Sequence, residues 1–428
     1  MREDLLHFIW KYKKLPSKNL KTSKNEKVEI LSVGGHNDLS GPDFFNAQIK
    51  IDDQLWAGNV EIHCNASDWY AHHHEEDVNY NNVILHVVWE NDIAIFRKDN
   101  TQIPTLELKN YIDQSLLENY QKLFAKEGKS FINCEKNITT VDPFLVQNWL
   151  DRLYFERLER KSNFILEILA QEKNDWEKVL FTMLLKNFGL KINGDSFFSI
   201  SQVLDFSIVR KTQHNKLELE SLLFGLAGFL DDKTQVDDYY ISLKKEYAYL
   251  KHKFSLIDES IQKPEFFKLR PPNFPTIRLS QFANVYATHQ SIFNKIINAK
   301  SLKELYAIFN VTATSYWDNH FIFGKTSKNH KKRLTQKFID LLIINTILPL
   351  KFCYYKHQGM DKEEVIFAIV SAIKKEENSI INNFKTIGQQ SKNAFETQAI
   401  LQLYNEYCTK NKCLQCAVGN SLLKNDFT

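Results

Sequence analysis

Two acidic residues near the start of the chain are placed as ligands of a hard metal ion would be. Asp43 follows Gly41-Pro42 where a strand-like run begins, and Glu61 lies on the next strand-like run, two residues before His63. Residues two apart on a strand project to the same face, so Glu61 and His63 would point together. If the strands are neighbours, Asp43 and Glu61 can share Mg²⁺ or Mn²⁺, which polarises a phosphate and lowers the pKa of a bound water. Both acids also suit ordinary structural roles.

This pattern resembles the motif of the PD-(D/E)xK nuclease superfamily. Pro42-Asp43 and Glu61 match it, and His63 occupies the position of its usual lysine. The resemblance implies that Asp43, Glu61 and His63 are catalytic, and that Glu3 of a leading helix adds a further acid. A lysine is a fixed cation, whereas a histidine stabilises charge only when it is protonated, or acts as a base. The substitution therefore leaves open a domain that has lost its activity.

Histidines concentrate around the acidic pair, because seven of the thirteen lie within residues 7–86. Imidazoles combined with carboxylates favour Zn²⁺, Mn²⁺ or Fe²⁺ over Mg²⁺. His36 lies in a glycine-bounded loop beside a strand, where functional side chains are common. His72 lies on a predicted helix, on the same face as an acid four residues before it. We therefore count His36 and His72 as candidate metal ligands beside Asp43 and Glu61.

The same histidines support a rival enzyme and two structural explanations. A zinc- or iron-dependent hydrolase of a small molecule could be built from His36, His63, His72 and His86. The run His72–His74 also suits the solvated face of a helix. His86 lies inside an apolar run, which suits a histidine whose polar atoms are satisfied in the core.

Cysteines near the C-terminus form a second candidate metal site. Cys408, Cys413 and Cys416 lie close together, the last two at C-x2-C spacing, and can wrap a tetrahedral metal. The fourth ligand would come from Cys134, Cys64 or a histidine. Some nucleases of the superfamily named above hold an iron–sulfur cluster with three clustered C-terminal cysteines and one upstream. This chain is similar, although Cys134 follows the nuclease-like core, and zinc, iron–sulfur and plain thiols all remain open.

A basic run later in the chain could contact nucleic acid. It includes Lys325, Lys331, Lys332 and Arg333, and such runs can follow the phosphates of DNA or RNA. A solvated connection between helices is the plainer explanation of the same charges.

The order of predicted elements favours an α+β protein. After a helix-like opening, apolar and alternating runs predict five strands, at 28–33, 44–51, 54–63, 83–90 and 105–108. A helix is predicted from about residue 67 to 80, between the third and fourth strands. This order describes a small α/β domain with a mixed, restriction-endonuclease-like sheet over residues 1–125. Helical spacing and scarce Gly and Pro predict a large, mostly helical domain over 126–428, ending in the cysteine cluster.

Composition is that of a soluble globular protein, with 43% hydrophobic residues, 25% charged residues and a formal charge of +3. The near balance of charge does not by itself suggest a nucleic-acid binder. The most apolar stretch, 341–355, is interrupted by polar residues and predicts a buried helix rather than a membrane span. The N-terminus lacks the apolar core of a secretion signal, and the six scattered cysteines suit a reducing compartment. We therefore expect a cytoplasmic protein that does not enter a membrane.

Motifs spread over nearly the whole chain resemble the bacterial domain-of-unknown-function family 2851. They are Gly35-His36-Asn37, Gly41-Pro42-Asp43-Phe44, Gly58-Asn59-Val60-Glu61-Ile62-His63, Ser67-Asp68-Trp69, His72 with His74, Tyr80 to Val88, Arg270-Pro271 with Asn273-Phe274-Pro275, Tyr316-Trp317, and Cys413-Leu414-Gln415-Cys416 with Gly419. The resemblance implies a soluble bacterial protein and brings no activity with it.

Function therefore depends on the acidic pair. The leading hypothesis is a Mg- or Mn-dependent nuclease or related phosphodiesterase that acts on DNA or RNA, in which Asp43 and Glu61 hold the ion. His63 would activate water or stabilise charge, and the basic run would help to cradle the nucleic acid. The alternatives are the transition-metal hydrolase of a small molecule and a non-catalytic scaffold that binds nucleic acid or protein.

Overall fold

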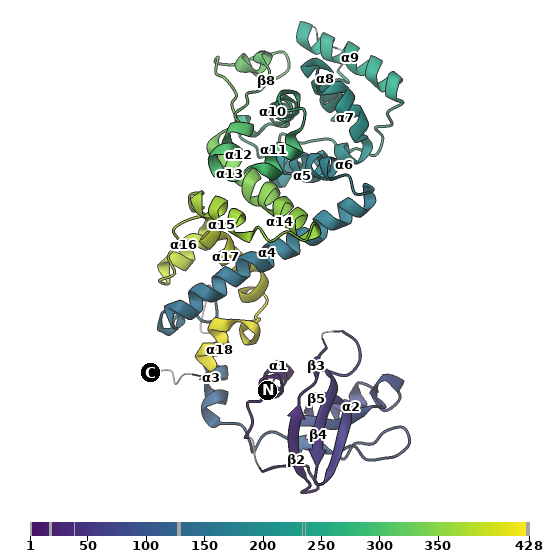
Figure 1. The fold of residues 1–428 in the computed structure, drawn as a ribbon, viewed down its shortest axis with the longest axis vertical. Helices are drawn as coiled ribbons and strands as arrows, with labels where there is room; N and C mark the ends of the chain where they lie inside the picture. The colour runs from purple at the N-terminus through teal and green to yellow at the C-terminus, as the bar shows by residue number, and fades with distance from the viewer. Residues whose placement is uncertain are drawn as a thin grey trace. The chain divides into compact units, whose positions relative to one another are not determined.

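The computed structural model describes residues 2–16, 19–37, 39–125, 130–232, 234–235 and 237–424. Its contacts divide the chain into two units (Figure 1). Unit 1 contains the residues up to Trp149 together with those from Tyr404 onward, and unit 2 runs from Leu150 to Leu403. Unit 1 carries a mixed sheet and unit 2 is mostly helical, so the predicted α+β class is confirmed. The domain division at 125–126, which rests on composition, stays a prediction.

The sheet of unit 1 has the order β1-β2-β4-β5-β6-β7, with β3 paired to β4. The strands are β1 (Leu20–Lys21), β2 (Lys27–Ser32), β3 (Gly35–His36), β4 (Phe44–Ile51), β5 (Gln54–Asn65), β6 (Val83–Glu90) and β7 (Thr105–Glu107). Strand β4 is antiparallel to its neighbours β2 and β5, whereas β6 is parallel to its neighbours β5 and β7. The five strands predicted from alternating and apolar runs are confirmed.

The burial of each strand follows its sequence. Along β4, Ala47, Ile49 and Ile51 are buried while the residues between them are more exposed, so the alternation decides which face packs on the core. In β6, the residues from Val83 to Val88 are all buried. A parallel strand that is covered on both faces has this apolar composition.

Helix α1 (Glu3–Lys11) packs against β5 and fixes the N-terminal side of the sheet. Its apolar residues, among them Leu5, Leu6 and Ile9, are fully buried. Trp10 Nε1 donates a hydrogen bond to the carbonyl of Val33 at 3.1 Å. The helix therefore has a fixed rotation about its axis, and its polar residues lie at the edge of this contact.

The helix predicted between the third and fourth strands is shorter than expected. Helix α2 (Asp68–Ala71) ends after four residues, and the 3-10 turn η1 (Val78–Tyr80) leads into β6. His73 adopts the left-handed conformation, with φ of 59°, which an α-helix cannot continue through. Because of this interruption, both His72 and His74 contact residues of β5.

Residues from both ends of the chain complete unit 1. Helix α3 (Gln114–Phe124) and turn η2 (Ile138–Thr140) follow the sheet, and the C-terminal segment adds η7 (Cys413–Gln415) and α18 (Ala417–Lys424). Helix α18 contacts α3 and η7, and η7 also contacts α1. The C-terminal segment is therefore part of the same unit as the sheet.

Unit 2 is built from helices around an aromatic core that includes Phe181, Phe188 and Phe282. Its elements, the first of which begins in unit 1 and the last of which ends there, are α4 (Pro143–Gln171), α5 (Trp176–Phe188), α6 (Leu190–Val203), α7 (Phe206–Thr212), α8 (Lys216–Leu226), α9 (Asp238–Phe254), η3 (Pro271–Asn273), α10 (Pro275–Thr288), α11 (Ile292–Asn298), α12 (Leu302–Ile308), η4 (Ser315–Asn319), β8 (His320–Ile322), β9 (Lys325–Thr326), α13 (Gln336–Leu342), η5 (Ile343–Ile347), α14 (Leu348–His357), α15 (Glu363–Ala372), α16 (Ser379–Thr386), α17 (Ala394–Gln402) and η6 (Leu403–Cys408).

One helical run, Gln336–His357, is long and apolar enough to cross a membrane, but 78% of its most apolar window is buried inside the protein. Within this run, Lys351 Nζ donates to the carbonyls of Ile296, Ile297 and Ala299 at 2.8–2.9 Å. A buried cation with three acceptors belongs to a protein core, where each polar group needs a partner. The predicted buried helix is confirmed, and its burial is that of a core helix in a soluble protein.

Strands β5 and β6 approach so closely at Gly58 that no side chain should fit there. An added Cβ would lie 2.4 Å from Ile84 Cγ2 and 2.6 Å from the backbone oxygen of Asn82. We expect Gly58→Ala to lower the free energy of unfolding by about 1–3 kcal/mol through overpacking. In Gly35→Ala, the matched control, the new Cβ meets nothing within 4 Å, and the change should stay within about 0.5 kcal/mol. Chemical denaturation measures both, and equal stabilities for the two variants would contradict this packing.

Candidate metal centre

The register of the sheet brings the acidic pair together. Phe44, next to Asp43, is paired with Val60, next to Glu61, across the antiparallel strands β4 and β5. On its other side, Glu61 is paired with His86 of the parallel strand β6. Glu61 therefore lies between Asp43 on one neighbouring strand and a histidine on the other.

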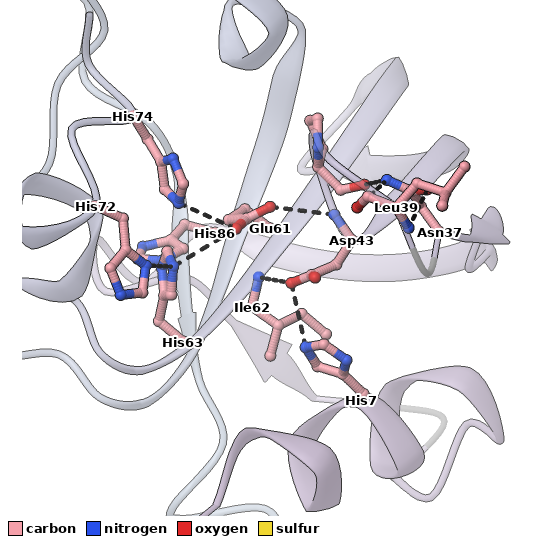
Figure 2. Close-up of polar contacts among 11 residues, drawn as sticks. His7, Asn37, Leu39, Asp43, Glu61, Ile62, His63, His72, His74 and His86 are labelled. Carbon is pink, nitrogen blue, oxygen red and sulfur yellow. Dashed lines mark hydrogen bonds and ion pairs between the residues drawn. The ribbon is translucent and has the colours of Figure 1, made fainter. Parts of the chain in front are cut away.

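Asp43 and Glu61 do not contact each other side chain to side chain; each carboxylate instead accepts a backbone N–H from the other segment (Figure 2). The backbone N–H of Asp43 donates to Glu61 Oε2 at 3.1 Å, and the N–H of Ile62 donates to Asp43 Oδ2 at 2.9 Å. His7 of α1 approaches from the other side, with Nε2 3.2 Å from Asp43 Oδ2. These contacts fix one oxygen of each carboxylate and so fix the direction of the other.

The second oxygen of Glu61 faces a group of imidazoles. Glu61 Oε1 lies 3.5 Å from His63 Nε2 and 3.4 Å from His74 Nε2, and His63 Nε2 lies 3.1 Å from His72 Nδ1. Each of His63, His72 and His74 offers a nitrogen within 4.8 Å of the others. Donors bonded to one tetrahedral ion at 2.0–2.1 Å lie roughly 3.4 Å apart. The three imidazoles therefore have the spacing of a metal-ligand set, and Glu61 lies beside two of them.

His86 supports this group from inside the sheet. Its Nε2 lies 2.8 Å from His63 Nδ1, and its ring is completely buried. A metal-ligating histidine usually uses its second nitrogen in such a contact, which fixes the ring and its tautomer. His72 is exposed, so the group is reached from solvent on that side while His86 closes it on the other.

Burial and neighbouring charge favour the neutral forms of Glu61, His63, His74 and His86 when no ion is bound. Burial, followed by the charge of Asp43, raises the pKa of Glu61 to about 9. Burial, followed by the positive charges of His74 and His72, lowers the pKa of His63 to about 3. Burial also lowers the pKa of His74 and of His86. Neutral imidazoles are the form that binds metals, and a bound cation would favour the ionised form of Glu61.

Three further polar residues lie on the Asp43 side. Burial by itself would lower the pKa of His7, but its contact with Asp43 outweighs this and raises it. The ring of His36 lies 5.7 Å from the ring of His7. Burial raises the pKa of Glu3, which also feels the charges of His7, Asp43 and His72. Glu3 is thus close to both parts of the site.

A cavity of about 460 Å³ opens beside Asp43, His7 and His36. Two acids in total line it. Four basic residues also line it, namely Arg2, Lys11, Lys410 and Lys412. The last two come from the loop between Cys408 and Cys413. An anionic group would be attracted into this cavity, next to Asp43.

The residues predicted for nucleic-acid contact lie in unit 2. Lys325, Lys331 and Arg333 are exposed. Lys332 is only 6% exposed, because its Nζ donates to the carbonyl of Asp318 at 3.2 Å and lies over the ring of Phe321. Three of these four cations therefore face solvent, and one holds the loop together.

Sequence reasoning did not single out His7 and passed over His74. His7 comes four residues after Glu3, so both lie on one face of a helix, and this spacing was the available signal. His74 looked like part of a solvated helix face, and only the early end of α2 turns it toward Glu61. The structure brings together Glu61, His63, His72 and His74, and places His36 and Asp43 at the cavity.

The family model described as "Protein of unknown function (DUF2851)" matches residues 3–379. The chain belongs to this family. The matched region includes every residue of the site except Arg2 and those contributed to the cavity by the C-terminal segment. No curated protein and no solved structure matches the chain significantly. Membership in DUF2851 therefore groups the chain with its relatives and leaves its activity to be argued from the site.

Removing the charge of Asp43 should lower the pKa of Glu61 in metal-free protein. Asp43→Asn keeps an oxygen for the N–H of Ile62 but removes the second-largest cause of the raised pKa. We expect the pKa to fall from about 9 while staying above its usual value, since burial remains. The measurement is an NMR titration of ¹³C-labelled glutamate, with Glu61→Gln identifying the signal.

Asp68→Asn is the matched control for this titration. Asp68 also accepts a backbone N–H, from Asn65 at 2.9 Å, but it is not among the charges that act most strongly on Glu61. The pKa of Glu61 should be the same in this variant as in the parent chain. Equal pKa values in Asp43→Asn and Asp68→Asn would contradict the coupling between the two acids.

Proposed function

We propose that unit 1 is a phosphodiesterase that depends on a divalent transition metal and acts on nucleic acid. The observation that carries the proposal is the group formed by the imidazoles of His63, His72 and His74, whose nitrogens all lie within 4.8 Å of one another, with Glu61 Oε1 3.4–3.5 Å from two of these imidazoles. Three imidazoles and one carboxylate favour Mn²⁺, Fe²⁺ or Zn²⁺ over Mg²⁺. Glu61, His63, His72 and His74 would hold the ion.

The topology supports a nuclease-like domain. Helix α1 is followed by the antiparallel strands β2, β4 and β5, then by α2 and the parallel strand β6. This is the order expected from the resemblance to PD-(D/E)xK nucleases. Asp43 precedes the second of the three strands and Glu61 lies on the third, which are the places where that pattern has its two acids.

The side chains around Asp43 suit the proton and charge steps of phosphodiester cleavage. When bound, the ion would polarise the phosphate and lower the pKa of a bound water. His7 lines the cavity and, with its raised pKa, can donate a proton to the leaving oxygen while Asp43 holds its ring. Because burial keeps His63 neutral, His7 rather than His63 would supply the positive charge of the missing lysine.

The charge of the cavity indicates a phosphate-bearing substrate. Arg2, Lys11, Lys410 and Lys412 lie along the wall that leads to His7 and Asp43. Contacts of this kind position a nucleic-acid backbone without reading its sequence. We therefore propose DNA or RNA as the partner of this surface, with the exposed Lys325, Lys331 and Arg333 as further contacts.

A second candidate function is hydrolysis of a small molecule at the same ion. The histidine-rich donor set favours it, because catalytic zinc sites are commonly built from three protein ligands that include two or three histidines. The cavity of about 460 Å³ that Asp43 and His7 line is large enough for such a ligand. We also propose a cytoplasmic location, where the thiols of the chain stay reduced.

Activity and metal binding should both fail when the histidine group is broken. We expect His72→Asn and His74→Asn to weaken Mn²⁺ binding by at least about tenfold and to cut cleavage of DNA or RNA by about 100-fold or more. His73→Asn is the matched control, since His73 is exposed and asparagine tolerates its left-handed backbone. The assays use single- and double-stranded DNA and RNA with each of Mg²⁺, Mn²⁺ and Zn²⁺.

The outcomes of these assays separate the candidate functions. Metal-dependent cleavage of nucleic acid that disappears with His72→Asn supports the proposal. Metal binding without cleavage of any nucleic acid, but with hydrolysis of small phosphate or carboxylate esters, supports the second candidate. Equal activity in His72→Asn, His74→Asn and His73→Asn would contradict both candidate functions.

Metal binding near neutral pH should release about one proton per site. Because the pKa of Glu61 is raised to about 9, its carboxyl is protonated at about pH 7.5 and the ion must displace that proton. The apparent affinity should therefore rise about tenfold per pH unit toward pH 9 and level off above it. Calorimetry in two buffers of different ionisation enthalpy measures the release. Asp43→Asn, which lowers this pKa, should release less, and an affinity independent of pH would count against Glu61 as a ligand.

A further inference from the structure

Four of the six cysteines gather in unit 1, away from the histidine group. Cys134 lies in the loop before η2, Cys408 ends η6, Cys413 begins η7, and Cys416 follows it. Burial raises the pKa of the Cys408 thiol, and the charges of Cys134, Cys416 and Cys413 raise it further. Asn133, the neighbour of Cys134, contacts Cys413 Sγ at 3.4 Å and Asn411 at 3.2 Å. The loop that carries Cys134 therefore meets the segment that carries the other three thiols, although Cys134 is remote in sequence.

A hydrogen-bond donor is directed at one of the sulfurs. Asn133 Nδ2 donates to Cys413 Sγ at 3.4 Å. Burial raises the pKa of the Cys416 thiol, while nearby backbone N–H groups act in the opposite direction. Donors of this kind stabilise a thiolate and tune thiolate-bound metals. A neutral thiol in an apolar core would not require them.

The two segments that carry the cysteines are tied to each other. Asn133 Nδ2 also donates to Asn411 Oδ1 at 3.2 Å, and Asn420 Nδ2 donates to the carbonyls of Leu414 and Cys416 at 3.0–3.1 Å. An added Cβ at Gly419 would lie 2.2 Å from the carbonyl oxygen of Cys413, so only glycine allows this close approach. The thiols are therefore held in place by their own supporting contacts.

We propose that Cys134, Cys408, Cys413 and Cys416 form a four-thiolate site for a thiophilic metal centre, either an iron–sulfur cluster or a zinc ion. Four cysteines with C-x2-C spacing in the last pair suit both occupants. The site is distinct from the histidine group and does not depend on the proposed phosphodiesterase activity. Cys134 also lines a second cavity, of about 450 Å³, which gives the centre an opening to solvent.

The spacing of the sulfurs ranks the cluster ahead of zinc. Among the residues that the structure describes, one group of three or more His, Cys, Asp or Glu residues has all its ligand atoms within 4.8 Å of one another. That group is His63, His72 and His74. No three of the four cysteine sulfurs are therefore this close, whereas thiolates on one zinc ion lie roughly 3.8 Å apart. In a four-iron cluster, each cysteine binds a different iron, and the sulfurs are farther apart.

The centre would also shape the cavity beside Asp43. Lys410 and Lys412 line that cavity and belong to the loop between the ligands Cys408 and Cys413. A metal bound at both ends of this loop would fix its backbone. Metal-ligand bonds that form only in the folded chain contribute directly to folding stability, so the metal would hold the C-terminal segment of unit 1 to the loop that contains Cys134.

The test uses the full chain carrying His72→Asn and His74→Asn, so that the histidine group binds no ion. The chain is purified without oxygen and, where metal is low, reconstituted separately with zinc or with iron and sulfide. Native mass spectrometry, metal analysis, acid-labile sulfide and visible absorption identify the occupant. We expect one centre per chain: iron, sulfide and a brown colour for a cluster, or colourless zinc-loaded protein for zinc. A chain that takes up neither metal overturns the proposal.

Substitutions then assign the ligands. Cys134→Ser, Cys408→Ser, Cys413→Ser and Cys416→Ser should each lower occupancy by more than about tenfold, whereas Cys64→Ser and Cys353→Ser, the control thiols, should leave it unchanged. Full occupancy in a variant that lacks all four ligands would overturn the assignment. Because a variant may fold poorly, alkylation of the unsubstituted cysteines provides an independent readout. The four ligand thiols should be protected when the metal is bound and reactive after chelation, and reactivity independent of metal would contradict the site.

Discussion

The buried carboxylate of Glu61 is the constraint on which the rest of the site depends. One of its oxygens accepts the backbone N–H of Asp43, so the other must face His63 and His74. The side chain is only 5% exposed, and burying an ionised carboxylate without a cation is very unfavourable. Glu61 therefore either keeps a proton or shares its charge with a positive ion. The imidazoles around it, held neutral by the same burial, provide the remaining ligands of such an ion.

The sheet provides this arrangement because β5 is paired antiparallel with β4 on one side and parallel with β6 on the other. The antiparallel pairing with β4 sets Asp43 beside Glu61, and the parallel pairing with β6 sets His86 behind His63. A shift of one residue in either register would turn Glu61 and His63 to the opposite face. The close contact of Gly58 with β6 opposes such a shift. Glu61 thus contacts the histidine group through one oxygen and, through the other, the backbone N–H of Asp43, which lines the cavity.

Much of the fold and part of the site could be predicted from the sequence. Alternation in β4 and the apolar run of β6 identified the strands, and the acids at 43 and 61 were expected to be neighbours. The ending of α2 was not predictable, because the left-handed backbone of His73 depends on packing rather than on propensity. That one conformation turns His74 from a solvated helix residue into a neighbour of Glu61. The contact between Asn133, next to Cys134, and Cys413 joins segments far apart in the sequence, and composition alone cannot identify it among the alternatives.

The position of the ion is the central claim, and anomalous diffraction tests it most directly. Crystals of the full chain soaked with Mn²⁺ should show an anomalous peak bounded by Glu61, His63, His72 and His74, with ligand distances of about 2.0–2.3 Å. The same soak of the His72→Asn variant should show a weaker peak or none. A peak between Asp43, Glu61 and Glu3 that no imidazole contacts would contradict the account, because the histidines would then be structural and the ion would be held by carboxylates alone.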